Sequence, residues 1–272
     1  MSLIDLTTPA NVKAWQSPPL TTTGDDAVIT RLITAASRFI LNELQRPILS
    51  SQLYTEQRDG EGGVAMVLRQ WPVTSIAALT IDGIATAPAA AGGRLPGWVL
   101  ESWDGWSAGQ PQKLSLIGGR FTRGVQNVVV SYAAGYLVAA EPQLVPASPG
   151  PYTVTPDFFW VGDGGVRYAG GDALTAVAAD PGAGQYVPPA TQGGVYQFDS
   201  ADAGAAVVLS YSYIPDDLQQ ACIALVSLRL SERARIGQVS KSLAGEVVAF
   251  TQKDMPADVA TTLQSYRRVI AP

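Results

Sequence analysis

The residues best suited to chemistry lie in a short aromatic and acidic segment between positions 98 and 106. Trp98, Trp103 and Trp106 alternate there with Glu101 and Asp104. An exposed indole ring can stack on a sugar, and two carboxylates are the groups that glycosidases use. The segment therefore has three interpretations: a core or subunit contact, which is its commonest use, a glycan contact through the three tryptophans, or glycosidase catalysis by Glu101 or Asp104.

Other catalytic equipment is sparse in the sequence. The chain has no histidine, which excludes Ser-His-Asp and Cys-His arrangements and the commonest metal ligand. The single cysteine, Cys222, lies on the apolar face of a predicted helix, so we expect it to be a core residue. With one cysteine no internal disulfide can form, and the fold needs no oxidising compartment.

Four aspartates in the middle of the chain are the remaining candidates for a metal site. Asp157, Asp163, Asp172 and Asp180 have a spacing that fits no EF-hand loop, and aspartate is also common in turns. The glycine-rich stretch 162–165 is not followed by the Lys-Ser/Thr pair of a phosphate-binding loop. We therefore expect no catalytic residue, cofactor or metal ion.

Charge is unevenly distributed along the chain. The net charge is −5, and charged residues make up only 15% of the sequence. Residues 137–214 carry seven acidic groups and one basic group, whereas the flanking segments are nearly neutral. This acidity argues against nucleic-acid binding by the middle segment. Neither an export signal nor a membrane-spanning stretch is evident, so no membrane contact is expected.

The two ends of the chain have helical patterns. Thr8-Pro9 favours a helix start, and that short helix should reach about Trp15. A second helix over 25–46 has apolar residues at three- and four-residue spacing. A third helix, 215–236, is apolar on more than one face, as expected of a helix that lies between two layers. After a polar and mobile segment, 240–254, Pro256 begins a last amphipathic helix.

The region between the second and third helices has strand patterns. The first group of strands is predicted at 53–58, 64–68, 76–81, 99–101, 114–117 and 126–132, and the turn residues 59–63 indicate a hairpin between the first two. A Pro-rich linker follows at 142–151. The second group is predicted at 152–155, 158–161, 166–168, 174–177, 195–198 and 205–213, with turns at 162–165 and 180–182. Short strands at this spacing are typical of a small sandwich or barrel.

These patterns predict an α+β fold with an insertion. Residues 1–136 and 214–272 should form one discontinuous core domain, in which a helical bundle packs with a β meander. Residues 137–213 should form an inserted all-β domain, with a sandwich-like or barrel-like arrangement.

The terminal segments resemble the head–tail connector, or adaptor, proteins of tailed bacteriophages. The resemblance rests on Asp5-Leu6-Thr7 with Val12-Lys13-Ala14-Trp15, the helix 25–46, Trp71-Pro72-Val73-Thr74-Ser75-Ile76, Ile81-Asp82-Gly83, Val130-Ser131-Tyr132-Ala133-Ala134-Gly135-Tyr136, Pro215-Asp216-Asp217-Leu218, Arg233 with Ile236-Gly237, and Tyr266-Arg267-Arg268-Val269. In that family the Ala-Gly-Tyr element is followed closely by the Pro-Asp-Asp-Leu helix start. Here roughly eighty residues intervene. The intervening segment is similar to small β modules of other phage structural proteins.

The resemblance implies a mechanical role rather than a chemical one. It implies a virion protein of the phage neck, assembled in the host bacterial cytoplasm, that forms a homo-oligomeric ring of about twelve copies. That ring would lie beneath the portal protein, extend the DNA channel and dock a tail-side stopper or tail-terminator protein. Passing DNA would not be bound by sequence. The alternative is a virion decoration or glycan-binding module that uses Trp98, Trp103 and Trp106.

The interface residues expected from this role lie near the ends of the last two helices. They are Arg233, Arg235, Tyr266, Arg267, Arg268, Val269 and Ile270. Two alternatives stay open for the last helix. Either it is loosely held in the free subunit and becomes ordered on the portal, or it is ordinary core of the subunit's own bundle.

Overall fold

The computed structural model describes residues 4–90, 95–102, 111–233, 240–243, 246–249 and 255–267. It is mixed α+β, as the sequence predicted, with helices and several antiparallel sheets. The chain forms two compact units. The first comprises residues within 1–48, 141–209 and 214–267, and the second comprises residues within 49–140 and 210–213.

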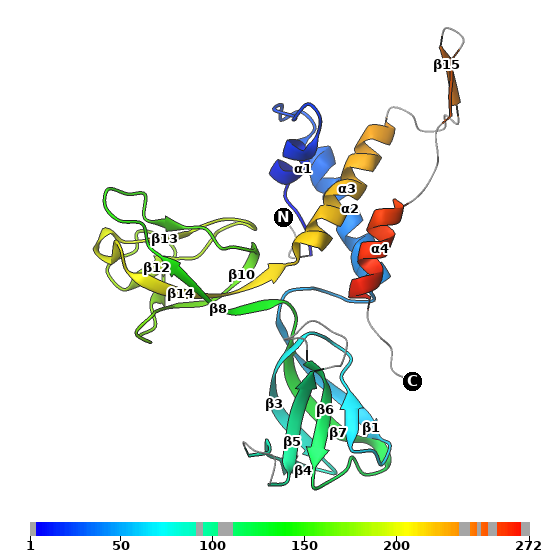
Figure 1. Ribbon diagram of the computed structural model, residues 1–272, viewed down its shortest axis with the longest axis vertical. Coiled ribbons are helices and arrows are strands. Elements are labelled where there is room, and N and C mark those ends of the chain that lie inside the picture. Colours follow the sequence, from blue (N-terminus) through cyan, green and yellow to red (C-terminus); the bar gives the residue numbers. More distant parts are fainter. Residues whose placement is uncertain are drawn as a thin grey trace. The chain divides into compact units, whose positions relative to one another are not determined.

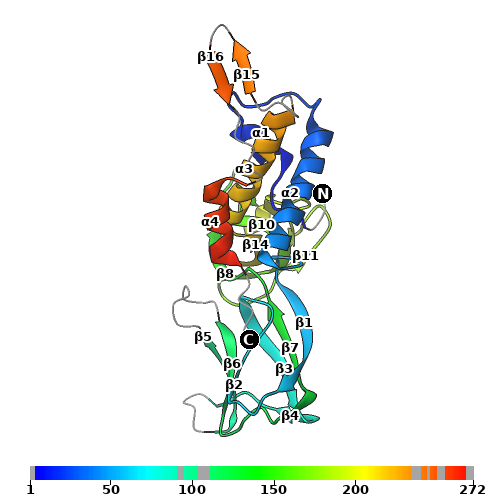
Figure 2. The ribbon, with the colours of Figure 1, turned by 90° about the vertical axis from the view of Figure 1, so that its right-hand side faces the viewer.

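Four helices of the first unit lie side by side (Figures 1 and 2). They are α1 (Pro9–Trp15), α2 (Asp26–Leu44), α3 (Asp216–Glu232) and α4 (Ala257–Tyr266). Both α2 and α3 contact all the other helices of this group. The Thr8 hydroxyl accepts a hydrogen bond from the Asn11 N–H at 3.3 Å, so the predicted N-cap of α1 is confirmed. No helix among the described residues is long and apolar enough to cross a membrane.

The helices are joined by a tightly packed apolar core. On α2 the predicted spacing is confirmed, because Ile29, Ile33, Ala36, Ile40 and Leu44 are all fully buried. On α3 the buried residues are Leu218, Ala221, Cys222, Ile223, Leu225 and Val226. The Cys222 sulfur lies 3.5 Å from the Ser37 hydroxyl, and burial raises the pKa of its thiol to about 12. Cys222 is therefore an unreactive core residue, as predicted.

The second group of strands builds two small sheets. One has the order β10-β14-β8 and contains Phe159–Tyr168, Ala206–Ile214 and Leu137–Leu144. The other has the order β11-β12-β13-β9 and contains Thr175–Ala176, Gln185–Val187, Tyr196–Phe198 and Thr153–Val154. Within the described part of the chain these strands pair only with one another. Their buried side chains include Trp160, Tyr186, Tyr196 and Tyr211.

The predicted turn at 162–165 is wrong. These residues lie inside β10, which continues through them as one strand. Asp163, in the middle of the stretch, accepts hydrogen bonds from the Tyr186 hydroxyl at 2.7 Å and the Tyr196 hydroxyl at 3.0 Å. Trp160 in turn donates its indole N–H to the Tyr196 oxygen at 3.0 Å. These side-chain contacts with distant strands hold the stretch extended despite its turn-like composition.

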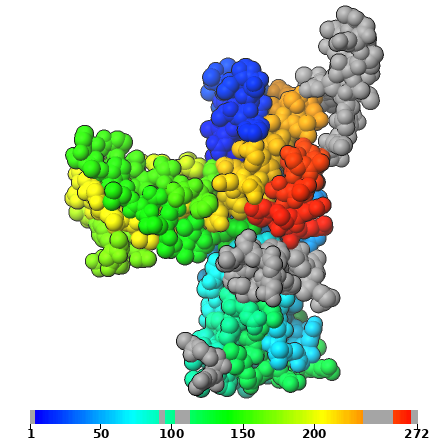
Figure 3. All heavy atoms as spheres, viewed as in Figure 1, coloured from blue at the N-terminus to red at the C-terminus, as the bar shows by residue number. Residues whose placement is uncertain are grey.

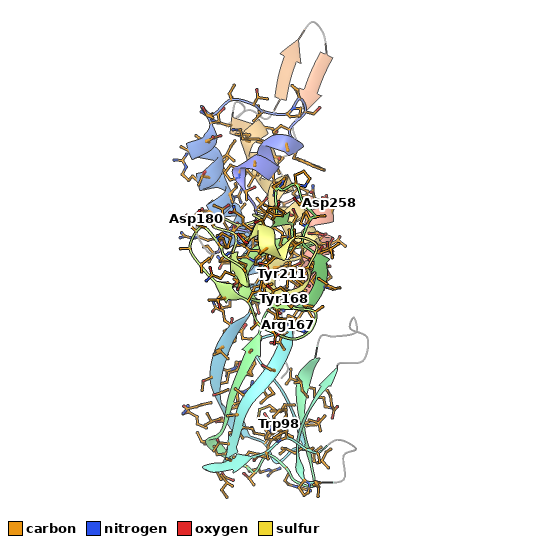
Figure 4. All side chains as sticks on the ribbon, turned by 90° about the vertical axis from the view of Figure 1, so that its left-hand side faces the viewer. Trp98, Arg167, Tyr168, Asp180, Tyr211 and Asp258 are labelled. Carbon is orange, nitrogen blue, oxygen red and sulfur yellow. The ribbon has the colours of Figure 1, made fainter. Side chains whose placement is uncertain are left out.

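Several tyrosine pKa values follow from such contacts. Burial, together with the nearby Asp163 carboxylate, raises the pKa of Tyr186 and of Tyr196. Tyr168 donates to the Asp202 carboxylate at 2.5 Å, and this hydrogen bond raises its pKa to about 12. Figure 4 labels Tyr168 on β10 and Tyr211 on β14. The hydroxyls of Tyr168, Tyr186 and Tyr196 are therefore neutral at physiological pH and donate hydrogen bonds to the carboxylates.

Removing the shared acceptor should destabilise this β module. The substitution Asp163→Ala leaves the hydroxyls of two buried tyrosines without their carboxylate acceptor, so we expect the free energy of unfolding to fall by about 2–4 kcal/mol. Asp172→Ala is the matched control, because Asp172 is an exposed aspartate of the same module. Urea unfolding followed by near-ultraviolet circular dichroism measures both variants. Equal stability of the two would show that water replaces the Asp163 carboxylate at no cost.

The second unit consists of two antiparallel sheets packed on one core. One has the order β1-β7-β3-β4, from Gln52–Gly60, Gly124–Ala134, Val73–Ile81 and Ile84–Thr86. The other has the order β2-β6-β5, from Ala65–Val67, Pro111–Ile117 and Gly97–Ser102. Tyr132, Leu114, Val128 and Phe121 lie in the core between them. Asp82 and Gly83 both have positive φ, as a two-residue hairpin turn between β3 and β4 requires.

The predicted hairpin around residues 59–63 is wrong. Strand β1 pairs with β7, and β2 pairs with β6 in the other sheet. The intervening residues bond to a third segment instead: the Gly62 N–H donates to the Phe121 carbonyl at 2.7 Å, and the Phe121 N–H donates to the Gly63 carbonyl at 2.8 Å. The glycines therefore carry the chain from one sheet to the other rather than reversing it within one.

The segment predicted to be polar and mobile, 240–254, contains a hairpin. Its strands are β15 (Ser240–Leu243) and β16 (Glu246–Ala249), paired antiparallel from Ser240 opposite Ala249 to Leu243 opposite Glu246. Among the described residues these two strands pair only with each other.

Candidate functional site

Three of the predicted interface residues fall on described parts of the helical group. Arg233 directly follows α3, Tyr266 is the last residue of α4, and Arg267 follows it. Arg235, Arg268, Val269 and Ile270 lie outside the described residues. In Figure 3 the surfaces of α3 (orange) and α4 (red) adjoin one another.

Arg233 joins the end of α3 to the beginning of α2. Its guanidinium Nη1 lies 2.8 Å from the Asp25 carboxylate, and the two side chains are 56% and 47% exposed. An ion pair this open contributes little stability because water screens it. The arginine thus keeps an open side on which a partner's carboxylate or carbonyl can bind.

Tyr266 lies at the other end of α3. Its hydroxyl donates to the Asp217 carboxylate at 3.2 Å, in the first turn of that helix. Between Asp217 and Arg233, α3 rises roughly 24 Å at 1.5 Å per residue. The structure therefore does not bring Arg233 and Tyr266 together: the predicted interface residues belong to two separate ends of the helical group.

The packing of α4 bears on the two alternatives left open for that helix. Val259 and Leu263 are 2% and 4% exposed, and α4 contacts both α2 and α3. Side chains buried to this extent are core residues of the subunit. The described part of α4 therefore favours the bundle alternative, and the docking role of residues near its end stays a proposal.

Trp15 is a candidate contact that the sequence did not single out. It ends α1 and is 56% exposed, whereas Val12 on the same helix is fully buried. Beside it, the Gln16 amide donates to the Ser227 hydroxyl of α3 at 2.8 Å, so this end of α1 lies on α3. Exposed tryptophan is the residue type most often found at the energetic centre of interfaces. Trp15 follows Val12 by three residues, a spacing that predicts the same buried face of α1 for both side chains. The sequence therefore did not indicate that Trp15 is exposed.

The alternative glycan site is only partly described. Trp98 on β5 is half-buried and packs against the core of the second unit (Figure 4), and Trp103 and Trp106 lie outside the described residues. Glu101 lies 3.1 Å from the Lys113 ammonium. The Ser115 hydroxyl and Lys113 lower the pKa of the Glu101 carboxyl, so it is ionised at neutral pH and unsuited to act as a general acid.

A pocket of about 210 Å³ lies within the first unit, between the helices and the β module. Asn11, Asp216 and Gln219 line it from the helices, and Asp157 and Phe158 from the loop before β10. Pockets for small-molecule ligands measure roughly 300–1,000 Å³. This smaller, acidic hollow has room for a side chain or a few water molecules.

Comparison with known proteins identifies the family. A model of the head completion protein family (HCP) matches residues 5–100 and 187–269, which is more than half of the chain. The chain belongs to the head completion protein family. This confirms the head–tail connector resemblance of the terminal segments, and it makes the chain a structural protein of the virion neck. No curated protein matches the chain. Among solved structures, a chain in the "Neck of empty GTA particle computed with C6 symmetry" aligns over 98% of this chain and 94% of its own, at 15% identity and a TM-score of 0.39.

The family match, like the helical group, consists of two separate segments of the chain. It contains all four described helices and stops between residues 100 and 187. That gap includes most of the predicted insertion, 137–213, together with β6 and β7 of the second unit.

Arg233 offers a direct test of the end of α3 in this head completion protein. Reversing its charge with Arg233→Glu places a like charge beside Asp25, so the free energy of unfolding should change by no more than about 1 kcal/mol. Attachment to neighbouring subunits or to portal rings, measured by sedimentation, should weaken about tenfold or more if the arginine contacts a partner. Arg31→Glu, an exposed arginine of α2, is the control. Equal attachment of the two variants would remove Arg233 from the interface.

Proposed function

We propose that the chain is the ring-forming adaptor of a phage neck. About twelve copies form a closed ring beneath the portal protein, extend the DNA channel and dock the next head-completion or tail protein. The observation that carries the proposal is the family match, because it spans every described helix of the chain.

The distribution of candidate contacts supports a ring. In a head-to-tail ring each subunit offers two different surfaces, one to each neighbour. The helical group has an exposed Trp15 beside the end of α3 that carries Arg233, and a second, separate end with Tyr266. Two distinct ends on one packed group of helices suit such repeated contacts.

The charge balance supports a channel that lets DNA pass. The whole chain has a net charge of −5, and its middle segment is the acidic part. Tight DNA binding needs many basic side chains on one surface. A weakly charged or acidic lining allows DNA to slide without being held, and it offers no means of reading sequence.

The insertion, residues 137–213, belongs to the proposal as a separate β domain. Its strands pair among themselves, and Tyr136 and Tyr213 at its two ends meet in a backbone hydrogen bond of 3.2 Å. Such a module can be added to a core domain without changing the path of the core chain.

Mass determination of the purified protein, alone and mixed with portal rings, tests the function. We expect a complex whose mass equals the portal ring plus a full ring of this chain. Absence of any complex with portal rings, under conditions where both proteins are folded, would refute the adaptor role.

A further inference from the structure

The hairpin β15–β16 has two outer strand edges whose backbone groups pair with no other described strand. It consists of two strands of four residues each, and no third strand pairs with it among the described residues. An isolated two-stranded hairpin is only marginally stable in water because its outer backbone groups stay unpaired and little apolar surface is buried. Pairing with another strand would satisfy those backbone groups.

The second unit offers a matching acceptor. Strand β1 is nine residues long and forms one edge of its sheet, since among the described strands it pairs only with β7. Long edge strands are usually protected by charged side chains or proline on the outer face. Leu53, Thr55 and Gln57, which share the outer face of β1, are all exposed and carry no charge, and Asp59 is the one charged residue on that face, at the end of the strand. Two of the strand's three charged residues, Glu56 and Arg58, are on the opposite, half-buried face.

The uncharged character continues across the sheet. The residues opposite Leu53, Thr55 and Gln57 on β7 are Ala133, Ser131 and Val129, and those beyond them on β3 are Ser75, Ala78 and Thr80. All nine positions have small or uncharged side chains. A strand added beside β1 would therefore extend a flat face without placing charges against one another.

We propose that the β15–β16 hairpin of one subunit adds to the β1 edge of a neighbouring copy of this chain. The addition extends the sheet β1-β7-β3-β4 by two strands and locks adjacent subunits through backbone hydrogen bonds. Each chain carries one donor hairpin and one acceptor edge, so the contact is head-to-tail and can close into a ring. This inference rests on the proposed ring.

Replacing residues 240–249 with ten Gly/Ser residues tests the donor side. The full-length variant should keep its unfolding midpoint, because the hairpin pairs with no other described strand. It should lose ring formation on portal rings, as measured by mass. Hydrogen exchange of the β1 amides, residues 52–60, should slow about tenfold or more on assembly of the unaltered chain and stay fast in the variant.

Engineered cysteines test the pairing itself. Subunits with Thr55→Cys are mixed with subunits carrying Lys241→Cys or Ser242→Cys and then oxidised under mild conditions. The native Cys222 does not compete, because it is buried with a thiol pKa of about 12. Disulfide-linked dimers of mixed composition are the expected product, and an Arg31→Cys subunit serves as the exposed control.

The outcomes separate this inference from the adaptor function. A ring that forms equally well without the hairpin overturns the hairpin contact and leaves the function intact. The same holds if the hairpin variant still forms rings but no longer binds the portal, or if a chain carrying both cysteines forms only an intrachain disulfide. If the unaltered chain forms no ring at all, the proposed function itself fails.

Discussion

Truncating the chain after Lys253 should lower the free energy of unfolding of the helical group by about 3–6 kcal/mol. The truncation removes α4, whose Val259 and Leu263 are buried against α2 and α3. Burying one such side chain contributes about 1.5–3 kcal/mol. Since whole domains are stable by only about 5–15 kcal/mol, a loss of this size should be plain in urea unfolding followed by far-ultraviolet circular dichroism.

A point variant makes the same test without shortening the chain. Leu263→Ala should cost about 2–5 kcal/mol because it leaves a cavity against the neighbouring helices. Gln264→Ala, at the adjacent exposed position, is the control and should be nearly neutral. If truncation leaves the melting temperature unchanged but abolishes attachment to portal rings, α4 is a docking tail and not part of the bundle.

Replacing residues 142–210 with a short Gly/Ser linker should leave the four helices folded. The strands in this segment pair among themselves, and the chain ends that flank it are close: the Tyr136 and Tyr213 rings stack edge-on with centroids 5.8 Å apart. A short linker can therefore close the gap without strain. The helical circular-dichroism signal should be retained while the strand contribution falls.

The deletion is also the sharpest test of the domain assignment. The helices share the small pocket around Gln219 with this segment, so some loss of stability is expected when that contact is removed. Complete loss of the helical signal would show that the segment is integral to the core and that residues 1–136 and 214–272 do not form a domain of their own.

The helices were the part of the fold that the sequence predicted best. Their signals are local: the Thr8 cap, the prolines before α3 and α4, and the three- and four-residue spacing on α2 all act within one or two turns of the chain. A local pattern needs no knowledge of what packs against it. For this reason the bounds of the helices agree closely with the prediction.

The strand errors come from long-range contacts. The glycines at 60–63 look like a hairpin turn, but their backbone groups bond to Phe121, far along the chain. The stretch 162–165 looks like a turn, but Asp163 is held in β10 by tyrosines from two other strands. Turn composition predicts local reversal, and it cannot report which distant segment competes for the same backbone groups.

The sequence could indicate individual interface residues, but not where these residues lie relative to one another. The sequence indicated Arg233 and Tyr266 as interface residues near the ends of the last two helices, and both are at helix ends. Their separation depends on how α3 and α4 lie against each other, which places Tyr266 beside Asp217 at the opposite end of α3 from Arg233. The exposure of Trp15 likewise depends on which face of α1 rests on α3.

A reconstruction of the intact virion tests the central claim most directly. We expect a closed ring of copies of this chain directly beneath the portal, with its subunits in head-to-tail contact around the DNA channel. Finding the chain as scattered single copies on the capsid surface would contradict it.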